Sequence, residues 1–400
     1  MNSGDLDGPA GCGPGPEELC TRLETEGAPI MGPVEDGWCD VTFAAVDREG
    51  MPGTTYRLRT LVDRALPGDL TMSPIAGSKL HALTLRLPAD LRVSYAFERE
   101  AADGTSSLVR DPFNPPSRLP DRRLEGAVAV LPEAEPLPIL DRAAQLDPAP
   151  PEEVLLHSAE LDAERRVWVS PPAEAADGPL PAVIVFDGSP EHSAPAVRDA
   201  LLAEGRIEPV VVVLVDQAER RDLDLPGNLF FSRFLVHELL PLLRARHRVS
   251  ADPAQVVLSG SSYGGLCAGW TALHFPEVVG GAILQSASCW YHPELPRLPG
   301  ADAPDLAAAP TPLLISAAEQ LPTAPVRIYQ EVGALELGPP PAQVWQTLAN
   351  RWLRSVLREK GYDTVYREFA GGHDPAWWRG TWADALEWML PATGAVRGDT

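Results

Sequence analysis

The chain has 400 residues, of which 44% are hydrophobic and 22% are charged, a composition typical of a globular protein with more than one domain. Its 33 basic and 56 acidic residues give a net charge of −23, which makes nucleic acids and anionic membranes poor partners. No run of 18 apolar residues occurs, so we expect no membrane-spanning helix.

Residues 1–35 begin with an acidic stretch rich in glycine and proline, and we predict a disordered leader there. This stretch has neither the basic nor the apolar region of a secretion signal. The odd number and wide spacing of the cysteines favour reduced thiols and a cytoplasmic location; they are Cys12, Cys20, Cys39, Cys267 and Cys289. Cys12 and Cys20 lack the paired spacing of a zinc site, so we expect no metal site.

Residues 36–130 have the pattern of a small β-domain. Short, partly alternating segments separated by Gly, Pro and Asp predict strands at 41–46, 56–62, 82–87 and 92–98. Their spacing suggests an all-β sandwich. Residues 131–153 are rich in proline and acidic residues, which predicts a linker to the second domain.

Residues 154–400 change to apolar strands that alternate with amphipathic helices. Strands are expected at 166–169, 182–186, 209–215, 256–258, 281–284, 326–329 and 365–369. Helical spacing is found at 230–246 and 342–360. This order predicts a mostly parallel sheet with helices on both faces, the α/β-hydrolase class. Functional residues are then expected at the carboxyl ends of the strands.

A G-x-S-x-G sequence with Ser262 at its centre follows the expected strand at 256–258. In this motif a sharp strand-to-helix turn exposes the serine oxygen and requires small residues two positions to either side, here Gly260 and Gly264. Ser261 does not fit, because the residue two positions before it is a serine. We therefore predict that Ser262 is the nucleophile of a serine hydrolase.

A serine hydroxyl needs an adjacent base, and His373 is the best placed of the eight histidines. It directly follows the last expected strand and is the last histidine, in agreement with the order nucleophile, acid, histidine. The acid should follow the preceding strand, and Glu336 is preferred because it lies beyond the strand end. Glu331 and Asp363 remain alternatives.

Two backbone N–H groups should form an oxyanion hole for the developing negative charge. One is expected from Tyr263, the residue after the nucleophile. The second should come from the loop after the strand at 182–186, which makes Gly188 and Ser189 the candidates.

Several segments carry a combined family signal. They are V-F-D-G at 185–188, R-D-L-D-L-P-G-N at 221–228, H-E-L-L-P at 237–241, G-S-S-Y-G-G-L at 260–266, Q-S-A-S-C-W at 285–290, G-G-H-D-P-A-W-W-R-G at 371–380 and D-P-F-N-P at 111–115. Together they resemble the enterochelin (enterobactin) esterase family over about residues 36–392. The resemblance implies a β-domain beside an α/β-hydrolase domain with Ser262, Glu336 and His373 as the triad. It also implies cytoplasmic hydrolysis of a cyclic tri-ester of catechol-acylated serine, usually as the ferric complex.

A ferric catecholate is strongly anionic, so its binding to this acidic protein should require arginines. Guanidinium groups pair with anions, and aromatic side chains can stack on catechol rings. The family segments contain Arg220, Arg221 and Arg379 together with Trp290, Trp377 and Trp378, which we predict to bind substrate. No cofactor is expected, because the iron would arrive with the siderophore.

Two other functions remain open. A serine esterase could act on other aromatic or acyl esters such as feruloyl esters, although the expected cytoplasmic location argues against a polymeric substrate. A non-catalytic siderophore-binding protein is disfavoured by the intact Ser262 and His373. Departures from the family pattern, Ser189-Pro190-Glu191 and an apparent insertion at 294–321, leave the identity of the siderophore open.

Overall fold

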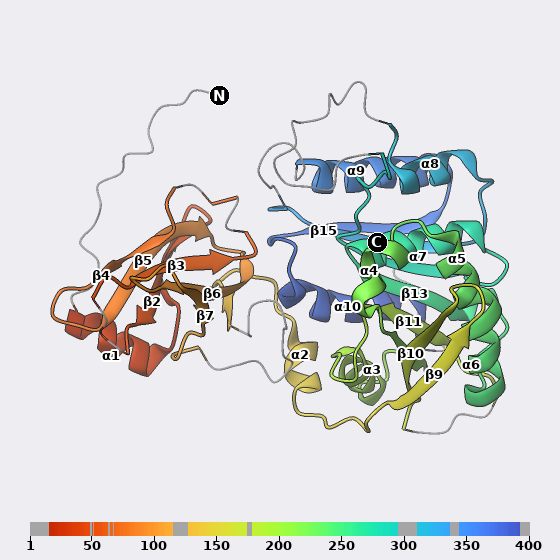
Figure 1. Cartoon of the computed structure of the whole chain (residues 1–400), viewed down its shortest axis with the longest axis horizontal. Coiled ribbons are helices and arrows are strands. Elements are labelled where there is room, and N and C mark those ends of the chain that lie inside the picture. The colour runs from red at the N-terminus through yellow and green to blue at the C-terminus, as the bar shows by residue number, and fades with distance from the viewer. Residues whose placement is uncertain are drawn as a thin grey trace. The chain divides into compact units, whose positions relative to one another are not determined.

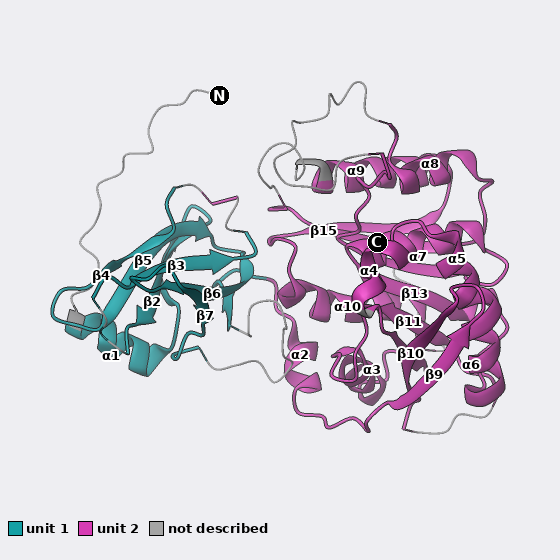
Figure 2. Ribbon diagram, viewed as in Figure 1, with its two compact units in different colours: residues 1–63, 67–134 teal, residues 64–66, 135–400 magenta. Residues whose placement is uncertain are grey.

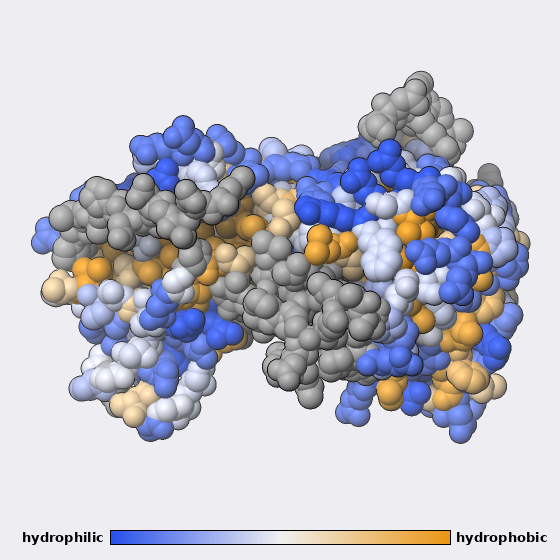
Figure 3. Space-filling view, turned by 90° about the horizontal axis from the view of Figure 1, so that it is seen from above, coloured by the Kyte–Doolittle hydropathy of each residue, from blue (hydrophilic) through white to orange (hydrophobic). Residues whose placement is uncertain are grey.

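The computed structural model describes residues 16–48, 50, 52–62, 65–66, 68–114, 127–173, 178–294, 310–336 and 344–392. The chain forms two compact units, residues 1–63 with 67–134 and residues 64–66 with 135–400 (Figures 1 and 2). Hydrophilic residues cover most of the face seen in Figure 3, with hydrophobic residues scattered among them. Within the described ranges, no helix combines the length and the apolar character needed to cross a bilayer.

The first unit is built from antiparallel strands. They are β1 (Ile30–Glu35), β2 (Trp38–Val46), β3 (Thr55–Thr60), β4 (Thr71–Pro74), β5 (Leu80–Pro88), β6 (Arg92–Glu100), β7 (Ser106–Val109) and β8 (Ala127–Val130). The strand order is β1-β2-β5-β4-β3-β6-β7, with β8 paired to β6. Phe43 of β2 and Tyr95 of β6 meet with ring centroids 5.0 Å apart, so two strands that are not neighbours in this order pack against each other in the core. The four predicted strands are confirmed as β2, β3, β5 and β6.

The predicted leader is wrong for residues 16–35, where helix α1 (Pro16–Glu26) precedes β1. Leu19 and Leu23 lie one helical turn apart and are both 1% exposed. They pack in a cluster with Ile30, Ala44 and Leu80. This burial holds α1 on the strands, so the first unit is not purely β. Residues 1–15 lie outside the described ranges.

The segment predicted as a linker, 131–153, contains helix α2 (Pro138–Ala143) and the start of β9. Ile139 and Ala143 of α2 are buried. The helix packs against α3 (Ala194–Ala203) and α10 (Pro375–Met389) of the second unit. Apolar contacts between distant segments therefore order a stretch whose composition suggested a linker.

The second unit contains the predicted mixed α/β fold. Its sheet has the order β16-β15-β14-β13-β11-β12-β10-β9. The strands from β16 to β12 run parallel, and β10 is antiparallel to both of its neighbours, β12 and β9. Their bounds are β9 (Glu152–Ser158), β10 (Ala163–Ser170), β11 (Ala182–Phe186), β12 (Val211–Val215), β13 (Val256–Ser261), β14 (Gly281–Gln285), β15 (Arg327–Gly333) and β16 (Asp363–Phe369). Every residue of β11, β12 and β14 is buried, as expected for a sheet covered on both faces.

Helices cover both faces of this sheet (Figure 1). The group with α7 (Tyr263–His274), α8 (Leu313–Gln320) and α9 (Val344–Glu359) packs together over β13, β14 and β15. The other face is covered by α3 and α10. The predicted helix at 230–246 consists of α5 (Leu229–Arg233), a π-helix (Phe234–Leu239) and α6 (Leu240–His247), and short turns include α4 (Arg221–Asp224), η1 (Ala218–Arg220) and η3 (Pro253–Gln255). Residues 295–309 of the apparent insertion lie outside the described ranges.

Candidate active site

Ser262 occupies a strained turn between β13 and α7. Its φ and ψ angles are 57° and −120°, a conformation that costs free energy and is common at functional sites. A Cβ on Gly260 would come within 2.6 Å of the Gly264 backbone, and one on Gly264 within 3.3 Å of Phe186 Cβ. Close packing around the turn therefore excludes a side chain at Gly260 and leaves little room for one at Gly264.

Hydrogen bonds to the end of β14 hold this turn in place. The Ser262 N–H donates to the Gln285 carbonyl at 3.0 Å, and the Ser262 carbonyl accepts from the Ser288 N–H at 2.9 Å. The half-buried Ser262 Oγ lies 3.3 Å from Ser288 Oγ. Sequence reasoning did not identify Ser288, whose only signal was its place in the family segment at 285–290.

The structure brings His373 and Glu336 together. His373 Nδ1 lies 2.8 Å from Glu336 Oε2, and the Glu336 side chain is 2% exposed while that of His373 is 31% exposed. The other carboxylate oxygen of Glu336 accepts from the Gly333 N–H at 2.8 Å and from the Ser286 hydroxyl. A carboxylate at Nδ1 fixes the imidazole orientation and leaves Nε2 to exchange protons with a reacting group.

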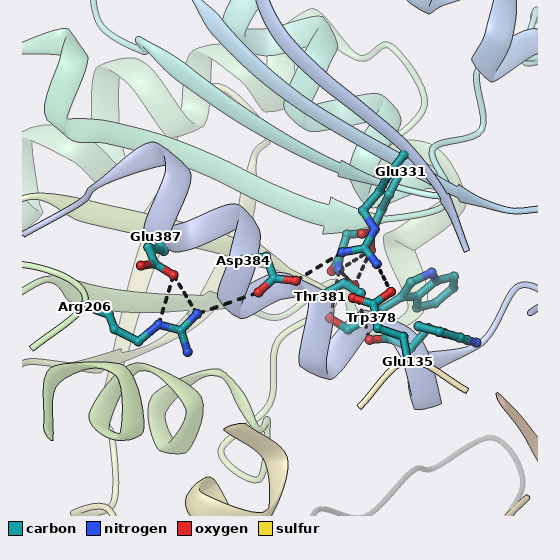
Figure 4. Close-up of polar contacts among 10 residues, drawn as sticks. Glu135, Arg206, Glu331, Trp378, Thr381, Asp384 and Glu387 are labelled. Atoms are coloured by element: carbon teal, nitrogen blue, oxygen red, sulfur yellow. Dashed lines mark hydrogen bonds and ion pairs between the residues drawn. The ribbon is translucent and has the colours of Figure 1, made fainter. Parts of the chain in front are cut away.

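The alternative acids have other partners. Glu331 lies inside β15, where its Oε1 accepts from Gln285 Nε2 at 2.8 Å and from Thr381 Oγ1 at 2.6 Å (Figure 4). Burial raises the pKa of Glu331 to about 7, against the effect of these hydrogen bonds and of Arg367. Asp363 starts β16, at the opposite edge of the sheet from the carboxyl ends, and pairs with Arg327 at 2.9 Å. Glu336 is the carboxylate at the imidazole.

Trp377 and Trp378 were predicted to stack on substrate, and this is wrong because they are only 1% and 5% exposed. Trp377 stacks on Phe369 and donates its indole N–H to the Ala370 carbonyl at 3.1 Å. Trp378 donates to Ser286 Oγ at 3.0 Å. Their burial comes from contacts with Phe369 at the end of β16 and with Ser286 after β14, a placement that depends on tertiary packing.

Gly188 was one candidate for the second oxyanion donor, and the structure argues against it. Its N–H donates to the Val215 carbonyl at 2.9 Å. A Cβ at this position would lie 2.7 Å from the Leu214 backbone, so the glycine permits close strand packing. Ser189 and Tyr263 remain the candidates. Tyr263 is the first residue of α7, and N–H groups at a helix start have no partner within the helix.

Arg221 is engaged within the protein. It forms two bonds to Asp187, from Nε at 2.6 Å and from Nη2 at 2.8 Å, and its guanidinium lies 5.5 Å from the Tyr263 ring centroid. Burial opposes and the Asp187 carboxylate favours the charged form, and on balance the pKa of Arg221 is raised. Arg221 therefore connects the loop after β11 to the start of α7. Its Nε and Nη2 groups are already bonded to Asp187.

The other predicted substrate-binding residues differ in exposure and contacts. Arg220 lies 3.5 Å from Asp224 with a side chain that is 43% exposed. Arg379 Nε donates to the Pro375 carbonyl at 3.1 Å within α10. Trp290 is half-buried, and its ring centroid lies 6.3 Å from that of Tyr263. Trp290 is thus the predicted aromatic residue that lies beside the nucleophile turn.

The described residues include no group of three His, Cys, Asp or Glu side chains that could hold a metal ion. The thiols of Cys20, Cys39, Cys267 and Cys289 are free. Burial raises the pKa of Cys267 and of Cys289, which keeps these thiols protonated and poor ligands.

The chain is similar to several known esterases. Residues 158–389 match the model of the family described as "Putative esterase". An iron(III) enterobactin esterase of Dickeya dadantii is 32% identical over a match covering 69% of this chain and 60% of that protein. An iron(III) salmochelin esterase of Escherichia coli O6:H1 is 29% identical, with 91% of each chain covered. The crystal structure of the Shigella flexneri enterobactin esterase, obtained in the presence of enterobactin, has a TM-score of 0.77 at 24% identity and covers 92% of this chain and 97% of that one.

Proposed function

Because the chain belongs to the family described as "Putative esterase", we propose that it hydrolyses ester bonds of a catecholate trilactone siderophore such as enterobactin. Ser262, His373 and Glu336 form the catalytic triad of this proposal. The observation that carries it is the 2.8 Å Glu336–His373 contact, made by loops after β15 and β16, together with the strained Ser262 after β13. Parallel strands place these ends at one edge of the sheet, which supports an α/β-hydrolase fold.

In the proposed mechanism Ser262 Oγ attacks the ester carbonyl while His373 Nε2 accepts its proton. Glu336 stabilises the imidazolium that forms, and the N–H groups of Tyr263 and Ser189 bind the oxyanion. Collapse of the tetrahedral intermediate releases the alcohol, which takes the proton from His373. Water then hydrolyses the acyl-enzyme by the same steps in reverse order.

The substrate class rests on the relatives, which are named as iron(III) enterobactin and salmochelin esterases. Trp290 would stack on a catechol ring beside the nucleophile, and Arg220 and Arg379 would face its negative charge. Iron would enter as part of the substrate. We further propose that the reaction takes place in the cytoplasm, in keeping with the free cysteines of the described chain.

The proposal is tested by incubating the protein with ferric and iron-free enterobactin and separating the products by chromatography. We expect the linear trimer, dimer and monomer to form with the wild-type protein and to be absent with Ser262→Ala. Hydrolysis of feruloyl esters without hydrolysis of the trilactone would support the alternative esterase function. Tight binding without turnover, unchanged by Ser262→Ala, would instead indicate a siderophore-binding protein.

A further inference from the structure

Ser288 lies beside the nucleophile and has no part in the steps described above. It is 2% exposed, and its hydroxyl oxygen is 3.3 Å from Ser262 Oγ. In the part of the chain that the structure describes, neither hydroxyl has a second hydrogen-bond partner. Side-chain hydrogen bonds in proteins go mostly to the backbone or to water. A buried hydroxyl that instead bonds to the reacting oxygen indicates a role in the chemistry.

The segment 286–289, which carries this hydroxyl, is held from behind by α9. Gln346 and Asn350 of this helix are 6% and 0% exposed. Gln346 Nε2 donates to the Ala287 carbonyl at 3.0 Å, and Asn350 Nδ2 donates to the same oxygen at 2.9 Å. Buried amides therefore fix the backbone next to Ser288.

The same segment also packs closely against the first turn of α7. A Cβ on Gly265 would lie only 2.9 Å from Ala287 Cβ. The N–H of Ser288 donates to the Ser262 carbonyl at 2.9 Å. The two hydroxyl groups are thus held in a fixed relation by backbone contacts, and such placement of reacting groups lowers the barrier of a reaction.

The direction of the hydrogen bond between the two serines decides whether it assists the reaction. A serine hydroxyl can donate one proton and accept at two lone pairs. If Ser262 donated, its proton would be directed at Ser288 and away from His373. If Ser288 donates, Ser262 keeps its proton for His373 and a second lone pair for the ester carbon.

We propose that Ser288 is a further catalytic residue, whose hydroxyl donates to Ser262 Oγ and orients that oxygen for attack. In this step the Ser262 O–H bond breaks, its proton passes to His373 Nε2, and the oxygen bonds to the acyl carbon. Ser288 keeps its own proton. When the acyl-enzyme is hydrolysed, the same O–H group stabilises the Ser262 oxygen as it leaves. The inference rests on the proposed function only in that Ser262 is the nucleophile.

The test uses the full chain and a fluorophosphonate ester, which labels an active serine without any siderophore. Ser262 Oγ displaces fluoride from phosphorus, and His373 takes the proton. Ser288→Ala keeps the backbone bond of residue 288 but removes the hydroxyl, so the labelling rate should fall roughly tenfold. Ser288→Cys fills the same space with a weak donor and should also be labelled several-fold more slowly than the wild type. The cysteine variant carries the test if the alanine variant does not fold.

Ser259→Ala is the matched control. Ser259 of β13 is 1% exposed, and its hydroxyl accepts from Trp382 Nε1 at 2.9 Å instead of touching a reacting atom. This variant should be labelled at the wild-type rate. The midpoint of the pH–rate profile for labelling should be the same in Ser288→Ala as in the wild type, because the substitution leaves the pair of His373 and Glu336 intact.

A wild-type labelling rate in Ser288→Ala would overturn the inference, and so would full recovery of the rate in Ser288→Cys. An equal loss in Ser259→Ala would trace the effect to a loosened core, and a shifted midpoint would trace it to the histidine, so either result also overturns it. Turnover of the trilactone is measured separately. Labelling of Ser262 without turnover refutes the proposed substrate alone, whereas full turnover by Ser288→Ala refutes only the role of Ser288.

Discussion

Trp378 lies edge-on against His373, with ring centroids 4.7 Å apart and ring planes at 89°. The same indole donates to Ser286, whose hydroxyl donates in turn to Glu336. The acid and the base of the proposed triad therefore share one buried support that joins α10 to the ends of β14 and β15. Gln285 adds to it, since its side chain bonds Glu331 and its carbonyl accepts the Ser262 N–H.

Ser262→Ala should lower the turnover of enterobactin roughly 10³-fold or more, by analogy with other triad deletions. The substitution removes the only atom that attacks the ester. Ser261→Ala is the matched control and should retain most of the activity, because Ser261 ends β13 and does not occupy the strained turn. Rates are measured by product chromatography under single-turnover conditions. Similar losses in both variants would show that the region matters only for folding.

Glu336→Gln should lower kcat/KM by roughly 10²-fold or more, since an amide cannot stabilise the imidazolium and can select the wrong tautomer. Glu331→Gln is the control at the alternative acid. It keeps an oxygen for Gln285 and Thr381, and it should change kcat/KM only a few-fold. The measurement is a pH–rate profile for both variants. If Glu331→Gln lowered kcat/KM more than Glu336→Gln did, Glu331 would be the acid of the triad.

The buried Glu331 should make the protein less stable as the pH rises from about 4.5 to 7. Its pKa in the folded state is about 7, above the 4.5 of an ordinary glutamate, so the folded chain holds a proton that the unfolded chain has released. The stabilisation is complete below this range and lost above it, and it amounts to about 3 kcal/mol. Arg367, which favours the ionised form, pairs with Asp384 and Glu135 and limits the shift (Figure 4).

Comparison of the wild type with Glu331→Gln isolates this contribution. Urea unfolding at pH 5 and at pH 8 should show a smaller fall in stability for the variant, because an amide does not titrate. The exposed Glu359→Gln substitution should behave like the wild type. If the wild type and Glu331→Gln lose equal stability between these pH values, the elevated pKa of Glu331 is wrong.

Trp378→Phe should lower kcat about tenfold with little change in KM, because it removes the bond to Ser286 that supports Glu336. A side chain that is 5% exposed has no surface to offer the substrate. Steady-state kinetics on the trilactone separates the two constants. A rise in KM with unchanged kcat would instead restore the substrate-stacking role that the sequence suggested. Trp377→Phe, which keeps the stacking on Phe369, serves as the control.

Local sequence determined the nucleophile turn and the positions of the main strands. The spacing of Gly260, Ser262 and Gly264 is a local steric requirement, and continuous apolar runs mark strands that are buried on both faces. His373 could be identified from chain order, because the loop after the last parallel strand has a predictable place at the sheet edge.

Tertiary structure alone decided which carboxylate contacts His373, which tryptophans are buried and whether Arg221 is already paired. Glu336 and His373 are 37 positions apart, and Arg221 and Asp187 are 34 apart. The same holds for α1 and α2, whose apolar residues are ordered by partners on distant segments. The physical reason is that such contacts depend on how separate strands and helices pack, which residue spacing within one segment does not encode.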